Sequence, residues 1–390
     1  MHWIVLFLLL IISFYLYKNE LEVMTVVSKV ASKRGPRVGI VSSWARQGVP
    51  YQSRFLSTCL SKKYDVFIFG YKNFIKDEAD WGYVNLVYTK VIQPWKVISW
   101  IKRENIKVIF FPDRLEDKKV LEWCRKNSVA TVMIINYETI KKKDFEHYKL
   151  YTKLHCPVKC TQLLLKDHGF KNTKFIRWGI DNDIFSPALI DIKRPIRFIH
   201  NAGFGGTEWR KNTLAAVEAF DYICKKKKDV ILILKSQRPI KEYPEKISRM
   251  IRDNGRIRVM DKEIGMNELI ELYRSCQVSL LPSKWEGIGI PFIESLALGL
   301  PVLTVDAPPM NEWVRGGYNG LCAKVARWEG RRDRQFITKG AIVDVDDYAK
   351  LMIKCTDAKL LDKLRANAIK GMKNSKKVFT KEINKFVGSL

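Results

Sequence analysis

The feature that most constrains the fold is an alternation of short apolar runs with helical patterns, which occurs twice along the chain. In the first half, runs rich in β-branched and aromatic residues lie at 37–43, 64–70, 84–90, 107–113 and 130–137. Helical patterns lie between them at 51–61, 95–104 and 115–126, and a loop is expected over 45–50. Buried strands that alternate with helices are typical of a doubly wound parallel sheet.

The alternation begins again after residue 195. Further strands are predicted at 196–203, 230–236, 256–261, 277–283 and 300–306, with a helix at 212–226, and the chain is helical after Val343. We therefore expect two Rossmann-like domains, residues 36–185 and 186–375, followed by a C-terminal helix at 376–390. Ligands of such sheets bind at the carboxyl ends of the strands, so the expected site lies in a cleft between two facing domains.

The stretch PSKWEGIGIPFIESLALGLPVLTVD, Pro282 to Asp306, carries the clearest chemical signal. After the strand ends, Gly287 and Gly289 allow the backbone to approach a ligand closely. Pro291 suits the first residue of a helix, and Gly299 suits its end. The free N–H groups at the start of such a helix favour an anion or a sugar hydroxyl.

Two carboxylates belong to this stretch, Glu286 before the expected helix and Glu294 in its first turn. The loop can direct both into one pocket, where carboxylates accept hydrogen bonds from the vicinal diols of sugar and ribose rings. The alternative is a surface loop that only caps a helix. Seven residues separate the two carboxylates, and with GIGIP between them and ALGLPV after them they resemble the E-x7-E segment of retaining family-4-like glycosyltransferases.

The resemblance covers roughly residues 37–390 and is strongest in the second half. RWGIDNDIFSP at 177–187 resembles the family's interdomain signature, and NEWVRGGYNGLCAKV, which includes Gly320, resembles the stretch after the last long strand. The family has the GT-B architecture of two facing Rossmann domains, which the strand pattern suggests independently. The resemblance implies that Glu286 contacts the donor sugar and Glu294 holds the ribose of the nucleotide. The amides near Gly287, Ile288 and Gly289 would help to hold the sugar or the phosphates.

The family neutralises the donor diphosphate with an Arg and a Lys that follow the first strand of the second domain. This chain has GFGGTEWRKN there, in which Lys211 matches the Lys, and Phe204 stands where the Arg is usual. Arg210 is the natural substitute. The alternative for Arg210 and Lys211 is a solvated helix start, although cations are unfavourable there without a bound anion.

In the first domain, Gly48 matches the position where the family's backbone approaches the diphosphate or the acceptor. Asp113 and Arg114 follow one predicted strand and Glu138 follows another, which makes them candidates for acceptor binding. Each of these residues can equally be structural.

A metal is not implied. The DVDD sequence at 344–347 resembles the DxD motif of other glycosyltransferases, but it precedes a helical segment and is interpreted as a helix N-cap. GT-B enzymes stabilise the leaving diphosphate with cationic side chains and helix dipoles instead. A zinc site at Cys156 and Cys160 would need two further ligands, and only His155 is nearby. The eight cysteines are therefore expected to be mostly buried, reduced thiols.

The N-terminal run WIVLFLLLIISFYLY, Trp3 to Tyr17, has no charged residue and ends at Lys18. It predicts an uncleaved membrane anchor over 1–17 and a linker over 18–35, because a cleaved signal peptide would carry a basic start and a small-residue cleavage site. A signal peptide and a buried helix are the alternatives. Positive residues follow the run and none precedes it, which favours a cytosolic catalytic part over a lumenal, Golgi-type one.

The net charge is +28, from 69 Lys and Arg against 41 Asp and Glu, and implies an anionic partner. The basic residues are scattered and no nucleic-acid-binding motif accompanies them, so nucleic acid is not the expected partner. An anionic membrane surface and a phosphorylated substrate are.

Together these features predict a membrane-anchored, metal-independent glycosyltransferase without a cofactor. It would move a sugar from a nucleotide-diphosphate sugar to a hydroxyl of a glycan, glycolipid or glycoprotein acceptor, and the resemblance implies retention of the anomeric configuration. A nucleotide-sugar epimerase or a phosphorylase of the same architecture is the first alternative. A basic nucleic-acid- or membrane-binding protein without enzymatic activity is the second.

Overall fold

The computed structural model describes residues 35–44, 48–71, 85–89, 91–187, 194–203, 210–331 and 333–390. It divides into two compact units, of which the first ends at Met133 and also includes Leu390, and the second runs from Ile134 to Ser389. The predicted anchor at 1–17 and the linker up to residue 34 lie outside the described residues. In the ranges given above, no helix is long and apolar enough to span a bilayer. The domain limits 36–185 and 186–375 remain predictions.

The first unit alternates strands and helices as the sequence predicts. Its elements are β1 (Arg37–Ser43), α2 (Gly48–Leu60), β2 (Val66–Tyr71), β3 (Leu86–Thr89), α3 (Pro94–Arg103), β4 (Ile106–Pro112), α4 (Lys118–Lys126) and the start of β5 (Ala130–Ile134). β1 pairs in parallel with both β2 and β4, and β2 pairs in parallel with β3. The five middle residues of β1 are buried, because a strand covered by helices on both faces has no solvated side.

Between β5 and residue 187 lie short elements that the sequence analysis did not predict. They are a 3₁₀ turn η2 (Tyr137–Thr139), α5 (Phe145–Tyr148), β6 (Lys153–Cys156), α6 (Lys159–Asp167) and β7 (Thr173–Phe175). β6 and β7 pair in parallel, and the sheet order is β3-β2-β1-β4-β5-β6-β7. Strands of three or four residues are too short to show a hydrophobic period, which is why the sequence did not reveal them.

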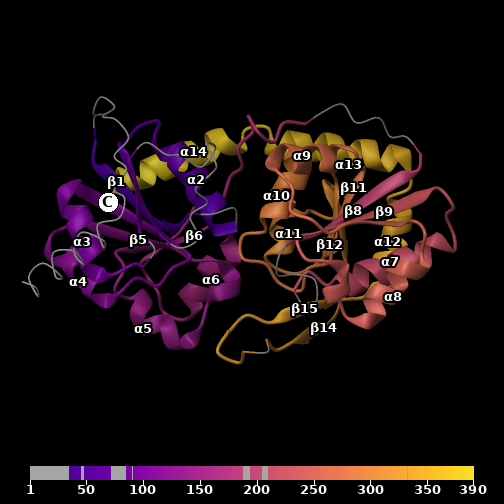
Figure 1. The fold of residues 1–390 in the computed structure, drawn as a ribbon, viewed down its shortest axis with the longest axis horizontal. Coiled ribbons are helices and arrows are strands. Elements are labelled where there is room, and N and C mark those ends of the chain that lie inside the picture. The colour runs from indigo at the N-terminus through magenta and orange to yellow at the C-terminus, as the bar shows by residue number, and fades with distance from the viewer. Residues whose placement is uncertain are drawn as a thin grey trace, which may run out of the picture. The chain divides into compact units, whose positions relative to one another are not determined.

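The second sheet begins after residue 194. Its elements are β8 (Ile196–Gly203), α7 (Thr213–Cys224), β9 (Val230–Ser236), α8 (Glu245–Asp253), β10 (Ile257–Met260), α9 (Met266–Arg274), β11 (Val278–Leu281), α10 (Ile290–Ala297), β12 (Val302–Val305), α11 (Met310–Trp313) and β13 (Gly320–Ala323). The strand order is β10-β9-β8-β11-β12-β13, and the paired strands are parallel. Figure 1 shows helices on both faces of this sheet, with α9, α10 and α13 on one side and α7, α8 and α12 on the other. The prediction of two parallel-sheet α/β domains is confirmed.

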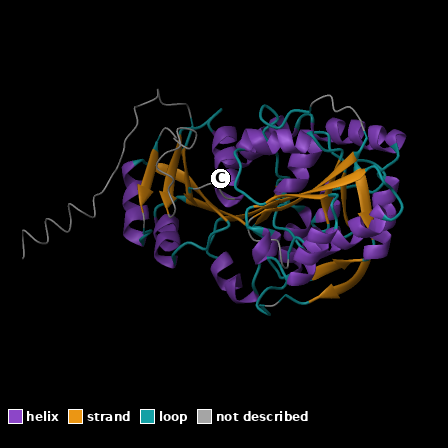
Figure 2. Cartoon of the chain, turned by 45° about the vertical axis from the view of Figure 1, so that its right-hand side comes forward, coloured by secondary structure: helices purple, strands orange, loops and turns teal. Residues whose placement is uncertain are grey.

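A two-stranded ribbon follows that the sequence analysis did not predict. β14 (Val325–Glu329) and β15 (Gly340–Val343) pair in antiparallel fashion and form a sheet of their own. We call residues 325–343 the β14–β15 hairpin; Figure 2 shows its two strands apart from the larger sheet. The Ala341 amide donates to the Lys284 carbonyl (2.8 Å), which attaches the hairpin to the loop between β11 and α10.

After Val343 the chain is helical, as predicted, in α12 (Val345–Lys354), α13 (Ala358–Met372) and α14 (Ser375–Val387). The DVDD segment is the N-cap of α12, because the Asp344 carboxylate accepts a hydrogen bond from the Asp347 amide at 3.0 Å. Lys376 lies 2.7 Å from the Asp181 carboxylate, so the RWGIDNDIFSP segment is held to the start of α14.

Two local expectations require correction. Gly48 does not lie in a loop; it is the first residue of α2, which begins three residues earlier than the predicted helix. Glu294 does not lie in the first turn of α10, because that helix begins at Ile290 and Glu294 is therefore its fifth residue. Each helix begins one to three residues before the predicted start, because a proline suits the first turn of a helix and does not have to be its first residue.

Candidate active site

Glu286 is the centre of a buried charged cluster in the second unit. It lies in the loop between β11 and α10, and only 3% of its side chain is exposed. The Arg210 Nη1 atom donates to Oε2 at 2.6 Å, and the Lys211 Nζ atom donates to Oε1 at 2.5 Å. Burial alone would raise the pKa of Glu286, but the charges of Lys211 and Arg210 hold this pKa below its ordinary value. The carboxylate is therefore ionised at neutral pH.

Arg210 and Lys211 come from the turn between β8 and α7. The Lys211 side chain is only 4% exposed. This burial is inconsistent with the alternative of a solvated lysine at a helix start, because lysines are rarely buried unless they are paired. Arg210 is 27% exposed and its carbonyl accepts a hydrogen bond from the Lys284 amide at 2.8 Å, so the turn is held against the loop that carries Glu286. The structure thus brings together the three residues for which a catalytic role is predicted.

The Gly287–Gly289 segment leads from this cluster into α10. Gly289 is the N-cap of α10 and has a φ of +87°, a left-handed conformation that favours glycine. The carbonyl of Ile288 accepts a hydrogen bond from Trp313 Nε1 at 2.6 Å. A Cβ atom at Gly287 would lie 2.9 Å from Glu138 Oε1, so the absence of a side chain there lets Glu138 approach the cluster.

Glu294 is also buried, with 8% of the residue exposed, but its environment differs from that of Glu286. Burial raises its pKa to about 7, while the charge of Lys211 and the hydroxyl of Tyr273 lower it. The Tyr273 hydroxyl accepts a hydrogen bond from Asn201 Nδ2 at 2.9 Å. Lys211 therefore acts on both carboxylates, as expected if the two are directed toward one place.

Two more charged residues join the cluster. Glu138 lies in η2, which follows β5 after two residues, and its Oε2 atom is 3.5 Å from Arg210 Nη1. Arg331 lies in the loop of the β14–β15 hairpin, where its Nη1 atom donates to the Glu138 carbonyl at 3.2 Å. Glu138 follows a predicted strand and is a sequence candidate for acceptor binding. Arg331 is one of several arginines in a basic stretch, and nothing in the sequence distinguished it.

Gly48 and Asp113 belong to the first unit, whereas the described contacts of the Glu286 cluster come from the second. A Cβ atom at Gly48 would meet nothing within 4 Å, so the described residues leave open space at the start of α2. Asp113 directly follows β4 and has a φ of +48°. Their roles in binding remain predictions.

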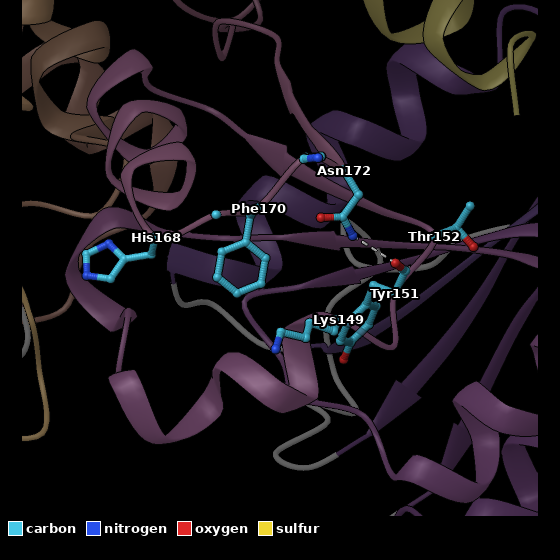
Figure 3. Close-up of a pocket in the computed structure, with 8 residues that line it drawn as sticks. Lys149, Tyr151, Thr152, His168, Phe170 and Asn172 are labelled. Atoms are coloured by element: carbon cyan, nitrogen blue, oxygen red, sulfur yellow. Dashed lines mark hydrogen bonds between the residues drawn. The ribbon is translucent and has the colours of Figure 1, made fainter.

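Elsewhere in the described ranges, the pockets and side-chain clusters contain none of the predicted site residues. Figure 3 shows a surface pocket beside α6, and its lining residues are Lys149, Tyr151, Thr152, His168, Gly169, Phe170, Lys171 and Asn172, none of which is a sequence candidate. In the described part of the chain, no group of three or more His, Cys, Asp or Glu side chains could hold a metal ion. None of the eight cysteines, all of which lie in the described ranges, forms a disulfide, and five of them are buried, in agreement with the expectation of mostly buried thiols.

A comparison with protein-family models matches residues 204–333 to the family "Glycosyl transferases group 1". This range begins directly after β8, ends within the β14–β15 hairpin, and includes Glu286, Glu294 and Arg331. No curated protein matches the chain by sequence.

Solved structures resemble the chain over most of its length. A glycosyltransferase from Rickettsia africae aligns with a TM-score of 0.72 at 13% identity, over 91% of this chain and 98% of its own. HepE of Anabaena, in complex with UDP and glucose, aligns with a TM-score of 0.70 at 12% identity, over 91% of this chain and 100% of its own. The sucrose-phosphate synthase of Thermosynechococcus elongatus has a TM-score of 0.66 at 13% identity, over 91% and 99%. The structural likeness shows the GT-B fold, and together with the group 1 domain it supports a GT-B glycosyltransferase.

Proposed function

We propose that this chain transfers a sugar from a nucleotide-diphosphate sugar to an acceptor hydroxyl, with retention of the anomeric configuration and without a metal. The observation that carries the proposal is the Glu286 carboxylate, which is buried and receives hydrogen bonds from two cations, Arg210 at 2.6 Å and Lys211 at 2.5 Å. The match of residues 204–333 to group 1 glycosyltransferases supports it. UDP and glucose bound to HepE illustrate the kind of donor that this fold accommodates.

The cluster has the electrostatics that transfer from a diphosphate requires. Negative charge on the leaving diphosphate grows as the bond to the sugar breaks, so cations fixed near it stabilise the transition state more than the bound donor. Desolvation of Lys211 is costly, and the Glu286 carboxylate compensates for it in the ligand-free chain. When the donor binds, its phosphates would share the two cations and its sugar hydroxyls would donate to Glu286. No metal has a step in this scheme.

The test of this function is the Lys211→Ala variant, assayed with a panel of nucleotide sugars. We expect turnover to fall by about 100- to 1,000-fold, the effect of removing one donor that stabilises an anionic transition state. Nucleotide affinity, measured by calorimetry, should change less, because the interaction strengthens along the reaction. Lys225→Ala is the matched control, since the Lys225 side chain is 74% exposed. Equal turnover of wild type and Lys211→Ala, in a folded protein, would contradict the role of Lys211.

The same assay separates the alternatives. A nucleotide-sugar epimerase would interconvert the donor without any acceptor, whereas a transferase needs an acceptor hydroxyl or water. Nuclear magnetic resonance of the first product formed reports the anomeric configuration and so tests retention. Full activity after treatment with a metal chelator is expected, and loss of activity that Mg²⁺ restores would contradict metal independence.

We also propose that the acceptor is a glycan, glycolipid or glycoprotein and that the chain lies on a membrane, with its catalytic part in the cytosol. The uncharged run Trp3–Tyr17, the positive residues that follow it and the net charge of +28 support this location.

A further inference from the structure

The guanidinium of Arg331 is held in one place by two aromatic rings. Its Cζ atom lies 4.0 Å from the centre of the Trp285 ring and 4.4 Å from that of Phe336. Nη1 donates to the Thr338 hydroxyl at 3.1 Å and to the Glu138 carbonyl at 3.2 Å. Stacking on aromatic faces orients a guanidinium without occupying the donors at its edge.

The hairpin loop that carries Arg331 is fixed at both of its ends. The Ile337 amide donates to the Ile140 carbonyl at 3.2 Å, and Lys141 lies 3.2 Å from the Asp333 carboxylate. On the other side, a Cβ atom at Gly340 would lie 3.1 Å from the Trp285 ring, so the hairpin backbone packs on that ring. The packing and hydrogen bonds of the hairpin therefore fix the position of the Arg331 side chain, unlike that of a solvated surface arginine.

Several N–H donors of the Arg331 guanidinium have no acceptor among the described residues. Arg331 is partly buried, and within the described ranges its Nε and Nη2 atoms donate no hydrogen bond. A guanidinium has five N–H donors arranged to bind a carboxylate or phosphate with two parallel bonds. Burial lowers the pKa of Arg331, and the charge of Arg210 lowers it further while Glu138 raises it. An additional anion would relieve both unfavourable effects.

The charges around Arg331 leave room for such an anion. The charges near Arg331 are the four cations Arg210, Lys211, Arg331 and Lys141, against the three carboxylates Glu286, Glu138 and Asp333. Glu294 stands outside this balance, because burial raises its pKa to about 7. The ring on which Arg331 stacks belongs to Trp285, the residue before Glu286, to which the proposed function assigns the sugar contact. Arg331 thus lies on the sugar side of the cluster, whereas Arg210 and Lys211 precede α7.

We propose that Arg331 is a specificity-determining residue that binds an anionic group, a carboxylate or a phosphate, on one of the two sugars at this site. The inference rests on the proposed function and deepens it by naming the substrate class. The group belongs either to the transferred sugar or to the acceptor sugar, because Arg331 contacts both the Trp285 side chain and the Glu138 carbonyl.

The experiment measures binding to the full chain by calorimetry in two arms. The donor arm compares UDP-glucuronate with UDP-glucose, and the acceptor arm compares methyl glucuronide with methyl glucoside at saturating UDP. We expect the wild type to prefer the charged ligand by about 10- to 100-fold in one arm, the range for a charge-assisted hydrogen bond. Arg331→Gln should abolish this preference and leave the affinity for UDP alone unchanged.

Two further variants keep the test sharp. Arg334→Gln changes an exposed arginine of the same loop and should retain the full preference. Arg331→Lys keeps the charge but cannot form two parallel bonds, so it should retain only part of the preference.

Three outcomes overturn the inference. The first is equal affinity of the wild type for charged and neutral ligands in both arms, a comparison that does not depend on the folding of any variant. The second is a folded Arg331→Gln variant that still prefers the charged ligand. An equal loss of affinity for UDP alone would assign Arg331 to the diphosphate instead. If the wild type binds no nucleotide at all, the proposed function fails and this inference fails with it.

Discussion

At the scale of single residues, two buried glutamates eight positions apart have pKa values that are shifted in opposite directions. Glu286 receives direct hydrogen bonds from two cations, which hold its pKa below the ordinary value despite burial. Glu294 is near Lys211, but within the described ranges it forms no ion pair, and burial raises its pKa to about 7 against the weaker effects of Lys211 and the Tyr273 hydroxyl. The difference follows from the two cations bonded to Glu286, whose charges outweigh the cost of burial there. Glu294 is therefore the group of this site that titrates near neutral pH.

The first prediction concerns the pH dependence of nucleotide binding. A raised pKa in the free protein means that Glu294 is protonated below about pH 7, and only the ionised carboxylate can accept two hydrogen bonds from a ribose diol. Affinity for the nucleotide should therefore rise between about pH 6 and pH 8 and be nearly flat in Glu294→Gln. Calorimetry across this range measures it. An identical pH profile in both proteins would contradict the ribose role of Glu294.

The second prediction gives the size of this contact. Glu294→Ala should weaken nucleotide binding by about 2–3 kcal/mol, the contribution of a bidentate charged hydrogen bond. The melting temperature serves as the control, because an alanine here also removes a buried group. Unchanged affinity in a protein that still melts cooperatively would exclude the contact.

At the scale of elements, Gly320 of β13 is a glycine of a sequence motif that allows two neighbouring strands to pack closely. Gly320 pairs with Val302 of β12, and a Cβ atom at Gly320 would lie 2.2 Å from the Val302 carbonyl oxygen. That oxygen belongs to the backbone of a neighbouring strand and cannot move without disturbing the sheet. The glycine in NEWVRGGYNGLCAKV is therefore explained by the close approach of two strands at the edge of the second sheet.

The third prediction follows from this contact. Gly320→Ala should lower the free energy of unfolding by about 1–3 kcal/mol or more, the cost of overpacking against atoms that cannot yield. Gly371→Ala is the matched control, because Gly371 lies in the last turn of α13 and a Cβ there meets nothing within 4 Å. It should leave the free energy of unfolding unchanged or raise it slightly, since no atom opposes the added methyl group and alanine is the better helix former. Urea denaturation measures both, and equal stabilities would refute the packing argument.

At the scale of the whole molecule, the charge of +28 is the property that acts over the longest range. Such a charge attracts anionic surfaces and phosphorylated ligands alike, and it contributes to affinity and encounter rate more than to the fold. The cationic cluster at Glu286 is a local, buried part of it, whereas the numerous exposed lysines act on the surroundings of the protein. The proposed membrane location and the proposed phosphorylated donor would therefore depend on different lysines and arginines.

The fourth prediction separates the anchor from this surface charge. Deleting residues 1–17 should leave a soluble, active enzyme that still binds acidic liposomes weakly, and binding should fall as salt rises because surface charges are screened. Liposome co-sedimentation at several salt concentrations measures this. For the intact chain, protease treatment of sealed vesicles reports orientation. If the catalytic part is protected until detergent is added, it is lumenal and the positive-inside argument is wrong.

Local order was predictable from the sequence because its causes are local. Alternating apolar runs predicted the two sheets and most of their helices, and β1, β8 and β9 begin and end where the pattern indicates. Pro291 indicated the start of α10 to within one residue, because a fixed φ is a property of the single residue. The spacing of Glu286 and Glu294 drew attention to the loop that carries the buried charged cluster, and the role of this cluster in binding and catalysis stays a prediction.

Only the tertiary structure decided which charges meet. Arg331 lies 45 positions after Glu286 and Glu138 lies 72 positions before Arg210, and no spacing rule relates residues so far apart in the chain. The β14–β15 hairpin and the short strands β6 and β7 place these side chains, yet each of these elements is too short or too polar to show a hydrophobic period. Tertiary contacts also decided the directions of the pKa shifts: burial raises the pKa of Glu294, whereas two bonded cations lower that of the likewise buried Glu286. The sequence by itself therefore determined the fold class and pointed to the loop of the candidate site, because both depend on local patterns. Long-range packing decided which charged side chains gather at that loop.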